Sequence, residues 1–430
     1  MFNNYKVTEK QFKYIIISIL IAVFLFVVNK PILTFKDSSG YLNMIILRSA
    51  GYPIFLYVLK KTFGAYFNLA IIILQFTFGA YAIRFLIYSL KKQYSLNNIW
   101  YILLLIILLI PYVYNQNLAN VILSESLTYP LYLICTAFFI TAFLEKKAKH
   151  LVLSLPVLLL LILTRSQFLF LIPVAIIILL YNSFTNKKFQ NKGLLLLLIA
   201  FPFITSLLDK TYHKIVHNEF VNTPWTGIHL ITPAFYVSDK EDYAIFDSEE
   251  EQLFFKNTYA DLYVKHLTTN NLLDEKYSGN DISTYINKYP EIANSTIFIS
   301  GKKTYNNTVN EDKQLIAIDR LTKKMTVPLI LNNFKKWISI YVKNFVHAFG
   351  NAKYTLLFFV LLIFSLYQTK KESKGYKIIC LLTLLTLSNV ALVSIGMHTI
   401  KRFTFYNDWV IFLVIFILFN FTKAPTKKLL

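Results

Sequence analysis

The stretch YIIISILIAVFLFVV, residues Tyr14–Val28, is the first of many long apolar runs in this chain and decides its class. A helix that crosses the hydrocarbon core of a bilayer needs roughly 17 to 25 mainly apolar residues, and runs a little shorter are tolerated. A short basic segment precedes the run, as in a signal peptide, but no small-residue cleavage site follows it, since the chain continues Asn29-Lys30-Pro31. We therefore expect a membrane span that stays in the protein.

The composition extends this interpretation to the whole chain. Of its 430 residues, 56% are hydrophobic and only 16% are charged. A soluble domain of this size could not bury so much apolar surface, so most of it must face lipid. The runs expected to span the membrane are Tyr14–Val28, Phe67–Leu90, Trp100–Tyr114, Thr128–Leu144, Leu151–Leu163, Phe168–Tyr181, Gly193–Leu208, Tyr354–Tyr367, Ile378–Ile395 and Trp409–Phe421.

The basic residues indicate orientation rather than a nucleic-acid partner. The net charge is +21, but Lys and Arg occur in short clusters between the apolar runs and do not line one face of a helix. Alternate loops are rich in Lys, which by the positive-inside rule places both termini in the cytoplasm and the loop that holds Asp37 outside. Cys135 and Cys380 both lie in apolar runs, so neither a disulfide nor a metal site is predicted from them.

One long segment breaks the series of spans. Residues 209–353 are of mixed polarity and have the length of a small domain. Within it, Val327–Phe349 has apolar residues at helical spacing and Lys on the other face, which predicts an amphipathic helix at the outer membrane surface.

The predicted fold is therefore an all-α polytopic membrane protein with about ten transmembrane helices. An extracytoplasmic domain, mixed or mainly α, is inserted between the seventh and eighth spans. The expected division is a seven-span module over residues 1–208, the inserted domain over 209–353 and three C-terminal spans over 354–430.

Acidic residues are rare outside the inserted segment, and three of them fall at the outward ends of spans. These are Asp37, Glu125 and Asp408. An ionisable group at a lipid boundary is costly unless it faces a cavity or a partner, so each is a functional candidate. Each also has a structural alternative: Asp37 could cap a helix, and Glu125 and Asp408 could complement helix dipoles.

Basic residues on the same side form the complementary set. Arg48, Arg165, Lys401 and Arg402 each stand where the chain leaves or enters an apolar run. Any one of them could simply reach lipid headgroups. Together they favour an outer site for an anionic group, to which arginine is suited by its two-pronged donor geometry. His398 is a lone imidazole near Arg402, and the histidines lack the spacing of a zinc site.

Several short motifs follow one another along the chain. They are Asp37 followed by Tyr41, Arg48-Ser49-Ala50-Gly51-Tyr52-Pro53, Ser124-Glu125-Ser126-Leu127, Leu163-Thr164-Arg165 and Lys401-Arg402-Phe403-Thr404-Phe405. Their order resembles that of membrane-embedded glycosyltransferases of the GT-C type, the superfamily that includes protein O-mannosyltransferases and aminoarabinose transferases. There are departures, since Ser166 and Tyr406-Asn407-Asp408 stand where relatives carry proline.

The resemblance implies transfer of a sugar from a polyprenyl-phosphate donor to a hydroxyl of a glycan, lipid or protein acceptor on the outer face, with inversion. Asp37 would be the catalytic base, and Glu125 would orient the acceptor or help bind a divalent cation. No cofactor is required by the sequence, although some relatives use Mg or Mn, and membrane lipids are the remaining partner. The donor phosphate would be held by Arg165, Arg402, Lys401, Arg48 and His398, with Tyr41 and Tyr52 binding substrate and Gly51-Tyr52-Pro53 forming a turn.

Two other functions remain open. A non-enzymatic flippase or carrier of lipid-linked sugar would use the same outer cations but also needs charges within spans, of which Arg84 is the nearest example. A polymerase or ligase of surface polysaccharide would give less reason for an acid in the first outer loop. The Lys-, Asn- and Ile-rich composition is typical of a low-GC bacterium, which predicts a bacterial cell-membrane enzyme with its active site outside.

Overall fold

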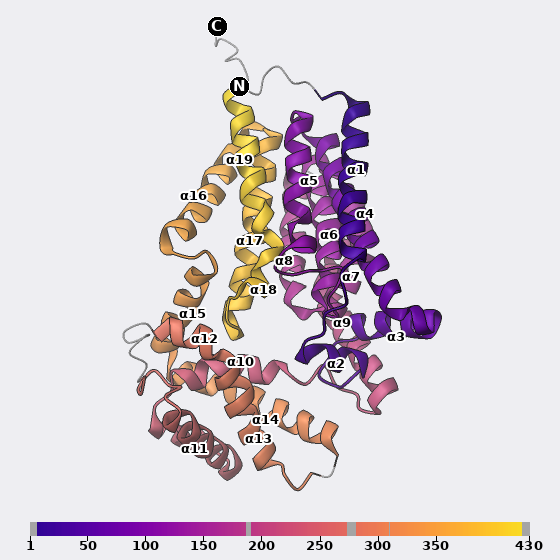
Figure 1. Cartoon of the computed structure of the whole chain (residues 1–430). Helices are drawn as coiled ribbons and strands as arrows, with labels where there is room; N and C mark the ends of the chain where they lie inside the picture. The colour runs from indigo at the N-terminus through magenta and orange to yellow at the C-terminus, as the bar shows by residue number, and fades with distance from the viewer. Residues whose placement is uncertain (1–6, 186–190, 273–280, 309, 424–430) are drawn as a thin grey trace. The chain divides into compact units, whose positions relative to one another are not determined.

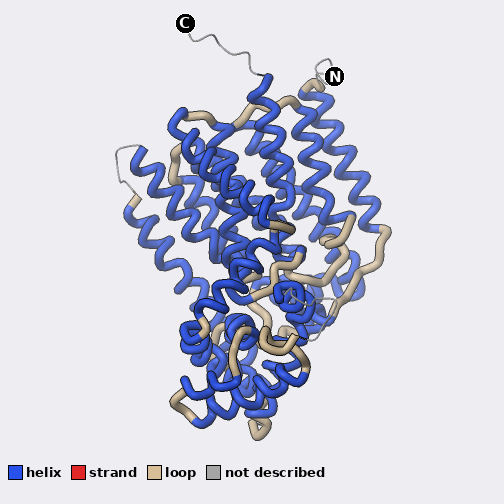
Figure 2. Tube along the Cα trace, turned by 90° about the vertical axis from the view of Figure 1, so that its left-hand side faces the viewer, coloured by secondary structure: helices blue, strands red, loops and turns tan. Residues whose placement is uncertain are grey.

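The computed structural model describes residues 7–185, 191–272, 281–308 and 310–423, and every regular element in these ranges is helical (Figure 2). No strand occurs in the described part of the chain, where an isolated bridge joins Leu33 and Val121. The all-α prediction is confirmed, including the described residues of the inserted segment, whose regular elements are all helices.

The chain divides into two compact units, which are described separately. The bundle unit comprises residues 1–208, 358–387 and 405–430, and the insert unit comprises residues 209–357 and 388–404. Helices α9 (Lys192–His217), α16 (Ala352–Gln368) and α17 (Lys374–Gly396) each continue from one unit into the other.

The remaining helices of the bundle unit are α1 (Glu9–Val28), α2 (Lys36–Leu42), α3 (Gly51–Phe63), η1 (Gly64–Tyr66), α4 (Phe67–Gln93), α5 (Asn98–Val113), α6 (Glu125–Glu145), α7 (Lys149–Thr164), η2 (Ser166–Phe170), α8 (Leu171–Thr185), η5 (Thr369–Lys371), η6 (Phe405–Asn407) and α19 (Asp408–Lys423). Those of the insert unit are α10 (Thr226–Tyr236), η3 (Lys240–Ile245), α11 (Glu249–Val264), α12 (Asp281–Ile292), η4 (Ala293–Ile297), α13 (Phe298–Thr304), α14 (Glu311–Asn332), α15 (Phe334–Ala348) and α18 (Lys401–Thr404).

Eight helical segments in the described ranges are long and apolar enough to cross a membrane. They are Glu9–Val28, Gly51–Gln93, Glu125–Glu145, Ser166–Thr185, Lys192–His217, Ala352–Lys371, Lys374–Gly396 and Lys401–Phe421. The predicted spans at Trp100–Tyr114 and Leu151–Leu163 form the shorter apolar helices α5 and α7. All ten predicted runs are thus helical, and whether all ten cross the membrane stays a prediction.

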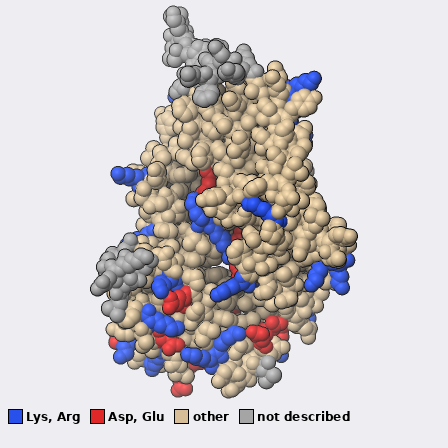
Figure 3. Space-filling model, viewed as in Figure 1, with Lys and Arg blue, Asp and Glu red and all other residues tan. Residues whose placement is uncertain are grey.

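Helix α6 lies at the centre of the bundle unit and packs mainly against α4 and α7. Tyr132, Cys135 and Phe139 on this helix have no exposed surface. By contrast, α1, the dark indigo helix of Figure 1, exposes large apolar side chains such as Ile17, Ile21 and Leu25, as expected for a helix that faces lipid. Most of the bundle surface visible in Figure 3 carries neither acidic nor basic side chains.

The insert unit has its own core, in which α10 packs against α14. Phe235, Phe254 and Phe255 are fully buried there. The insert unit therefore has a hydrophobic core of its own, in which helices bury their apolar faces against one another.

The amphipathic segment predicted at Val327–Phe349 is helical, with an interruption at Asn333 that separates α14 from α15. Lys336 and Lys343 are 45% exposed and form ion pairs with Asp239 and Asp281 of the same unit. The location of this segment at a membrane surface stays a prediction.

Candidate functional site

Asp37 lies in the first turn of the short helix α2 and carries an ion pair rather than a cap. The backbone N–H of Phe35 donates to Ser38 Oγ at 2.9 Å, so Ser38 supplies the side-chain bond at the start of this helix. Arg48 Nη2 donates to Asp37 Oδ1 at 2.8 Å. The Asp37 side chain remains 34% exposed and that of Arg48 is 23% exposed. The carboxylate is therefore both held and accessible.

Arg48 is positioned by its neighbours on the same loop segment. Its guanidinium carbon lies 4.6 Å from the centroid of the Tyr41 ring, a cation–π arrangement. Gly40 leaves room for it, since a Cβ at this position would come within 2.9 Å of Arg48 Nε. The packing of Arg48 against Tyr41 and Gly40 thus limits the movement of the guanidinium that pairs with Asp37.

A second ion pair joins Glu125, the first residue of α6, to Arg165, the residue after α7. Arg165 Nη1 lies 2.8 Å from Glu125 Oε1, and the side chains are 14% and 2% exposed. The acidic group also stands at a helix N-terminus, where the macrodipole favours negative charge. Its place at the start of α6 is consistent with the dipole role considered for Glu125, and its pairing with Arg165 was not predicted.

Two hydrogen bonds connect these ion pairs. Tyr41 Oη donates to Ser124 Oγ at 3.1 Å, and Ser124 Oγ donates to Glu125 Oε2 at 3.3 Å. Since Tyr41 also lies under Arg48, the contacts run without interruption across three loop segments. We call this set the polar network, and it consists of Asp37, Arg48, Tyr41, Ser124, Glu125 and Arg165.

Backbone pairing fixes the first loop segment, residues 29–50, against the second, residues 114–124. The Leu33 N–H donates to the Asn120 carbonyl at 2.7 Å, and Ser38 Oγ donates to the Ile122 carbonyl at 2.9 Å. The Asn120 side chain donates in turn to the carbonyls of Val27 and Lys30 at 2.9 and 3.0 Å. The segments that carry Tyr41 and Ser124 are therefore mutually anchored.

Tyr52 supports the second loop segment from inside the bundle. It is fully buried and donates to Gln75 Oε1 at 2.8 Å, while Gln75 Nε2 lies within hydrogen-bond distance of the carbonyls of Leu118, Ala119 and Val121. Its ring meets the edge of Tyr41 at 5.2 Å between centroids. The structure thus places Tyr52 behind Tyr41, where it orients the network without being exposed.

Gly51 brings the start of α3 directly against the end of α7. A Cβ on Gly51 would fall 2.3 Å from Thr164 Oγ1 and 2.8 Å from the Thr164 backbone nitrogen. Thr164 precedes Arg165, so this close approach helps to set the position of the buried guanidinium. Gly51-Tyr52-Pro53 was expected to form a turn, whereas these residues begin helix α3.

His398, Lys401 and Arg402 belong to the insert unit, whereas Asp408 begins α19 in the bundle unit. His398 is 9% exposed, and its Nδ1 lies 2.9 Å from the carbonyl of Ile286. Lys401 is exposed and Arg402 partly buried on the short helix α18. His398, Lys401 and Arg402 therefore belong to a different compact unit from the polar network.

Ser124, Gln75 and Asn120 are residues to which the sequence assigned no role. Gln75 stands in the middle of an apolar run, and a polar side chain at such a place usually has a specific partner. That signal was available, although its three backbone partners could not be predicted from it.

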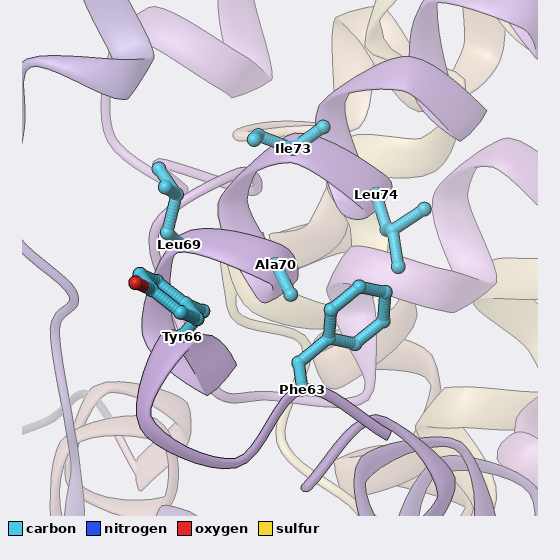
Figure 4. Close-up of a pocket in the computed structure, with 6 residues that line it drawn as sticks. All are labelled: Phe63, Tyr66, Leu69, Ala70, Ile73 and Leu74. Atoms are coloured by element: carbon cyan, nitrogen blue, oxygen red, sulfur yellow. The ribbon is translucent and has the colours of Figure 1, made fainter.

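The described residues include no group of three or more His, Cys, Asp or Glu side chains arranged to hold a metal ion. An apolar pocket of about 250 Å³ lies where α3, η1 and α4 meet, lined by Phe63, Tyr66, Leu69, Ala70, Ile73 and Leu74 (Figure 4). None of these residues belongs to the polar network. The lining surface of the pocket is wholly apolar, and in Figure 4 the Tyr66 hydroxyl points away from the other lining side chains.

The fold defines an all-helical protein with long apolar helices compatible with an integral membrane protein. No family model, curated protein or solved structure matches this chain.

Proposed function

We propose that this chain is a membrane glycosyltransferase that moves a sugar from a polyprenyl-phosphate donor to a hydroxyl acceptor on the outer face of a bacterial cell membrane. The observation that supports this most is the polar network, in which an accessible carboxylate, Asp37, is coupled through Arg48 and Tyr41 to the buried Glu125–Arg165 pair. A base and cations within one connected set are what a phosphate-releasing transfer needs.

In this proposal Asp37 takes the proton of the acceptor hydroxyl. The acceptor oxygen then forms a bond to the anomeric carbon while the bond from that carbon to the phosphate oxygen breaks, and the phosphate leaves with the electron pair. In-line displacement inverts the anomeric centre. Arg48, 2.8 Å from Asp37, is the nearest cation to the forming charge and can donate to the phosphate as well as to the carboxylate.

Glu125 acts by positioning Arg165 rather than by touching substrate. Its side chain is only 2% exposed and engages the guanidinium directly. A cation held by a buried partner is pre-oriented, so it loses little entropy when it meets the developing charge. The acceptor would be a glycan, a lipid or a protein that carries the reacting hydroxyl.

The test is Asp37→Asn in purified protein reconstituted into liposomes with a labelled polyprenyl-phosphate sugar and a mixture of hydroxyl acceptors. A lost general base lowers rates by about 10² to 10⁴-fold, so transfer should fall at least a hundredfold. Asp408→Asn is the matched control, because Asp408 is an exposed acid in the first turn of α19 and should retain transfer.

Full transfer by Asp37→Asn would contradict the assignment. Wild-type liposomes that move the labelled lipid between leaflets without transferring the sugar would instead support the carrier alternative.

A further inference from the structure

Helices α3 and α4 belong to one long apolar segment that bends at Gly64. The segment Gly51–Gln93 has 43 residues, about twice the number that one crossing of a bilayer needs. Gly64 has a φ of +48° and a ψ of −114°, a conformation that residues with a side chain rarely adopt. The bend at this glycine turns α3 away from the direction of α4, as Figure 1 shows.

The pocket of Figure 4 lies at this bend and has the size and polarity of a site for a hydrocarbon chain. Its volume is about 250 Å³ and its lining surface is wholly apolar. Pockets for drug-sized ligands span about 300–1,000 Å³ and contain a few convergent polar groups. A sugar or a nucleotide would lose its hydrogen bonds with water in this pocket and find none in return. Part of an acyl chain needs no such bonds. We call this site the elbow pocket.

The outer face of α3 is apolar and exposed. Ile54, Tyr57 and Val58 are exposed and share one face at helical spacing. Phe63 and Tyr66, which line the elbow pocket, are exposed as well. In a bundle whose helices have the length of membrane spans, a continuous exposed apolar surface of this kind is suited to contact with lipid.

Two lysines end α3 beside the elbow pocket. Lys60 stands three residues before Phe63, so the two side chains lie on the same face of the helix. Lys61 Nζ lies 5.7 Å from the centroid of the Tyr57 ring. Both lysines are exposed, and Figure 3 shows basic side chains at the projecting end of α3.

No carboxylate neutralises these lysines within the described residues. The chain contains no Asp or Glu from residue 38 to residue 124, and neither Lys60 nor Lys61 forms an ion pair with a described acid. Lysines at the end of a helix also complement its dipole, a role that needs no ligand. An apolar pocket with two unneutralised cations beside it matches the two parts of an anionic lipid.

We infer that the bend binds a phospholipid with an anionic headgroup. One acyl chain occupies the elbow pocket, and the ammonium groups of Lys60 and Lys61 contact the headgroup phosphate. Lysine suits this contact because its flexible stem carries a compact charge that needs no fixed geometry. The site lies within the bundle unit and uses no residue of the polar network, so the inference does not depend on the proposed function.

The test measures which lipid reaches the elbow pocket. The full chain is reconstituted into phosphatidylcholine liposomes with a trace of a photoreactive lipid, either phosphatidylglycerol or phosphatidylcholine, that carries a diazirine in one acyl chain. Peptide mass spectrometry after irradiation locates the label. Each lysine at an anionic surface contributes about fivefold in affinity, so phosphatidylglycerol should label residues 63–74 roughly tenfold or more above phosphatidylcholine. On the lipid-facing surface of α1 this ratio should be close to one.

The double variant Lys60→Gln with Lys61→Gln removes both charges and keeps two polar side chains on an exposed surface. The ratio of the two labels at the elbow pocket should fall to its value on α1. The matched control is Lys370→Gln with Lys371→Gln, which changes another pair of adjacent exposed lysines of the bundle unit, with Lys370 Nζ 5.6 Å from the centroid of the Tyr367 ring. This control should keep the wild-type ratio.

Leu69→Ser tests the pocket separately from the charges. Leu69 lines the elbow pocket and is already 44% exposed, so the protein should fold with serine there. Labelling by both lipids should fall to a similar degree, while their ratio stays that of the wild type. Labelling that does not change in Leu69→Ser would show that the acyl chain lies elsewhere.

Equal labelling of the elbow pocket by the two lipids, or a wild-type ratio in Lys60→Gln with Lys61→Gln, would overturn the inference and leave the lysines their dipole role. Absence of lipid label together with a dimeric mass would show that a second copy of the chain covers the pocket instead. None of these measurements uses sugar transfer, so their outcome and that of Asp37→Asn are independent.

Discussion

The two ion pairs of the polar network have the same length and opposite surroundings. Asp37–Arg48 and Glu125–Arg165 both measure 2.8 Å, but the carboxylate is 34% exposed in the first and 2% exposed in the second. An exposed pair contributes little to stability because water and salt screen it, whereas a buried pair is costly to break because it leaves a charge without solvent or partner. The comparison teaches that contact distance does not distinguish the two carboxylates. Burial does, because Asp37 is accessible from outside the protein and Glu125 is not.

The largest loss of stability is expected when one partner of the buried ion pair, Glu125–Arg165, is replaced. Glu125→Gln leaves Arg165 buried without its counter-charge, which costs about 3–5 kcal/mol. Asp37→Asn should cost no more than about 1 kcal/mol. Thermal unfolding of the purified protein in detergent measures both variants side by side.

The control for this prediction is the double variant Glu125→Leu with Arg165→Leu, which removes both charges and should be more stable than Glu125→Gln. Equal destabilisation by Glu125→Gln and Asp37→Asn would show that burial does not separate the two pairs.

An intermediate effect is expected at the close approach that places Arg165. Gly51→Ala forces a methyl group into the space of Thr164, where the distances of 2.3 and 2.8 Å cannot be accommodated without a shift of α3 or α7. Overpacking of this kind costs about 1–3 kcal/mol. Sugar transfer should fall as well, because Arg165 follows Thr164.

Gly193→Ala is the matched control for Gly51→Ala. A Cβ there meets no atom within 4 Å, and alanine favours the helix by up to about 1 kcal/mol relative to glycine. If Gly51→Ala unfolds at the same temperature as Gly193→Ala and transfers sugar normally, the contact does not position the buried pair.

The smallest loss of stability is expected for a third ion pair, which is more exposed than both ion pairs of the polar network. Asp239 and Lys336 of the insert unit lie 2.6 Å apart with side chains 44% and 45% exposed. The Lys336 hydrogen bond is the main cause that lowers the pKa of Asp239, with Asn270 adding to it. The folded pKa lies below the unfolded one, so this stabilisation is present above the ordinary carboxyl range and is lost as the pH falls through the folded pKa.

Lys336→Ala should therefore lower stability at neutral pH by less than about 1 kcal/mol, and the difference from wild type should disappear in acid and shrink in high salt. Unfolding curves over a pH series measure it. A difference that persists at low pH would point to lost packing of the lysine stem instead.

Local features of the sequence predicted the secondary structure well. Each of the ten apolar runs is helical, because the length and polarity of a run are read from adjacent residues. The helices α5 and α7 have 16 residues each, fewer than the 20 or more of each segment long enough to cross a membrane. The interruption at Asn333 was not predicted, since apolar spacing continues across it.

The candidate site was predicted by residue type more than by geometry. Asp37 and Arg48 stand eleven residues apart on one segment, and the sequence named both without pairing them. Glu125 and Arg165 are joined across a helix pair, and Tyr41 reaches Ser124 across 83 residues. Such partners depend on how α2, α3, α6 and α7 pack, which no local pattern encodes.

By itself, the sequence determined that this chain is helical and apolar enough for a membrane, and it named the few charged residues outside the inserted segment, because hydrophobic length and charge are properties of each stretch alone. Only the tertiary structure decided which carboxylate is exposed, which arginine neutralises which acid and where Tyr52 and Gly51 act. Those outcomes depend on burial and on distances between segments far apart in the chain, and these quantities exist only once the helices have packed.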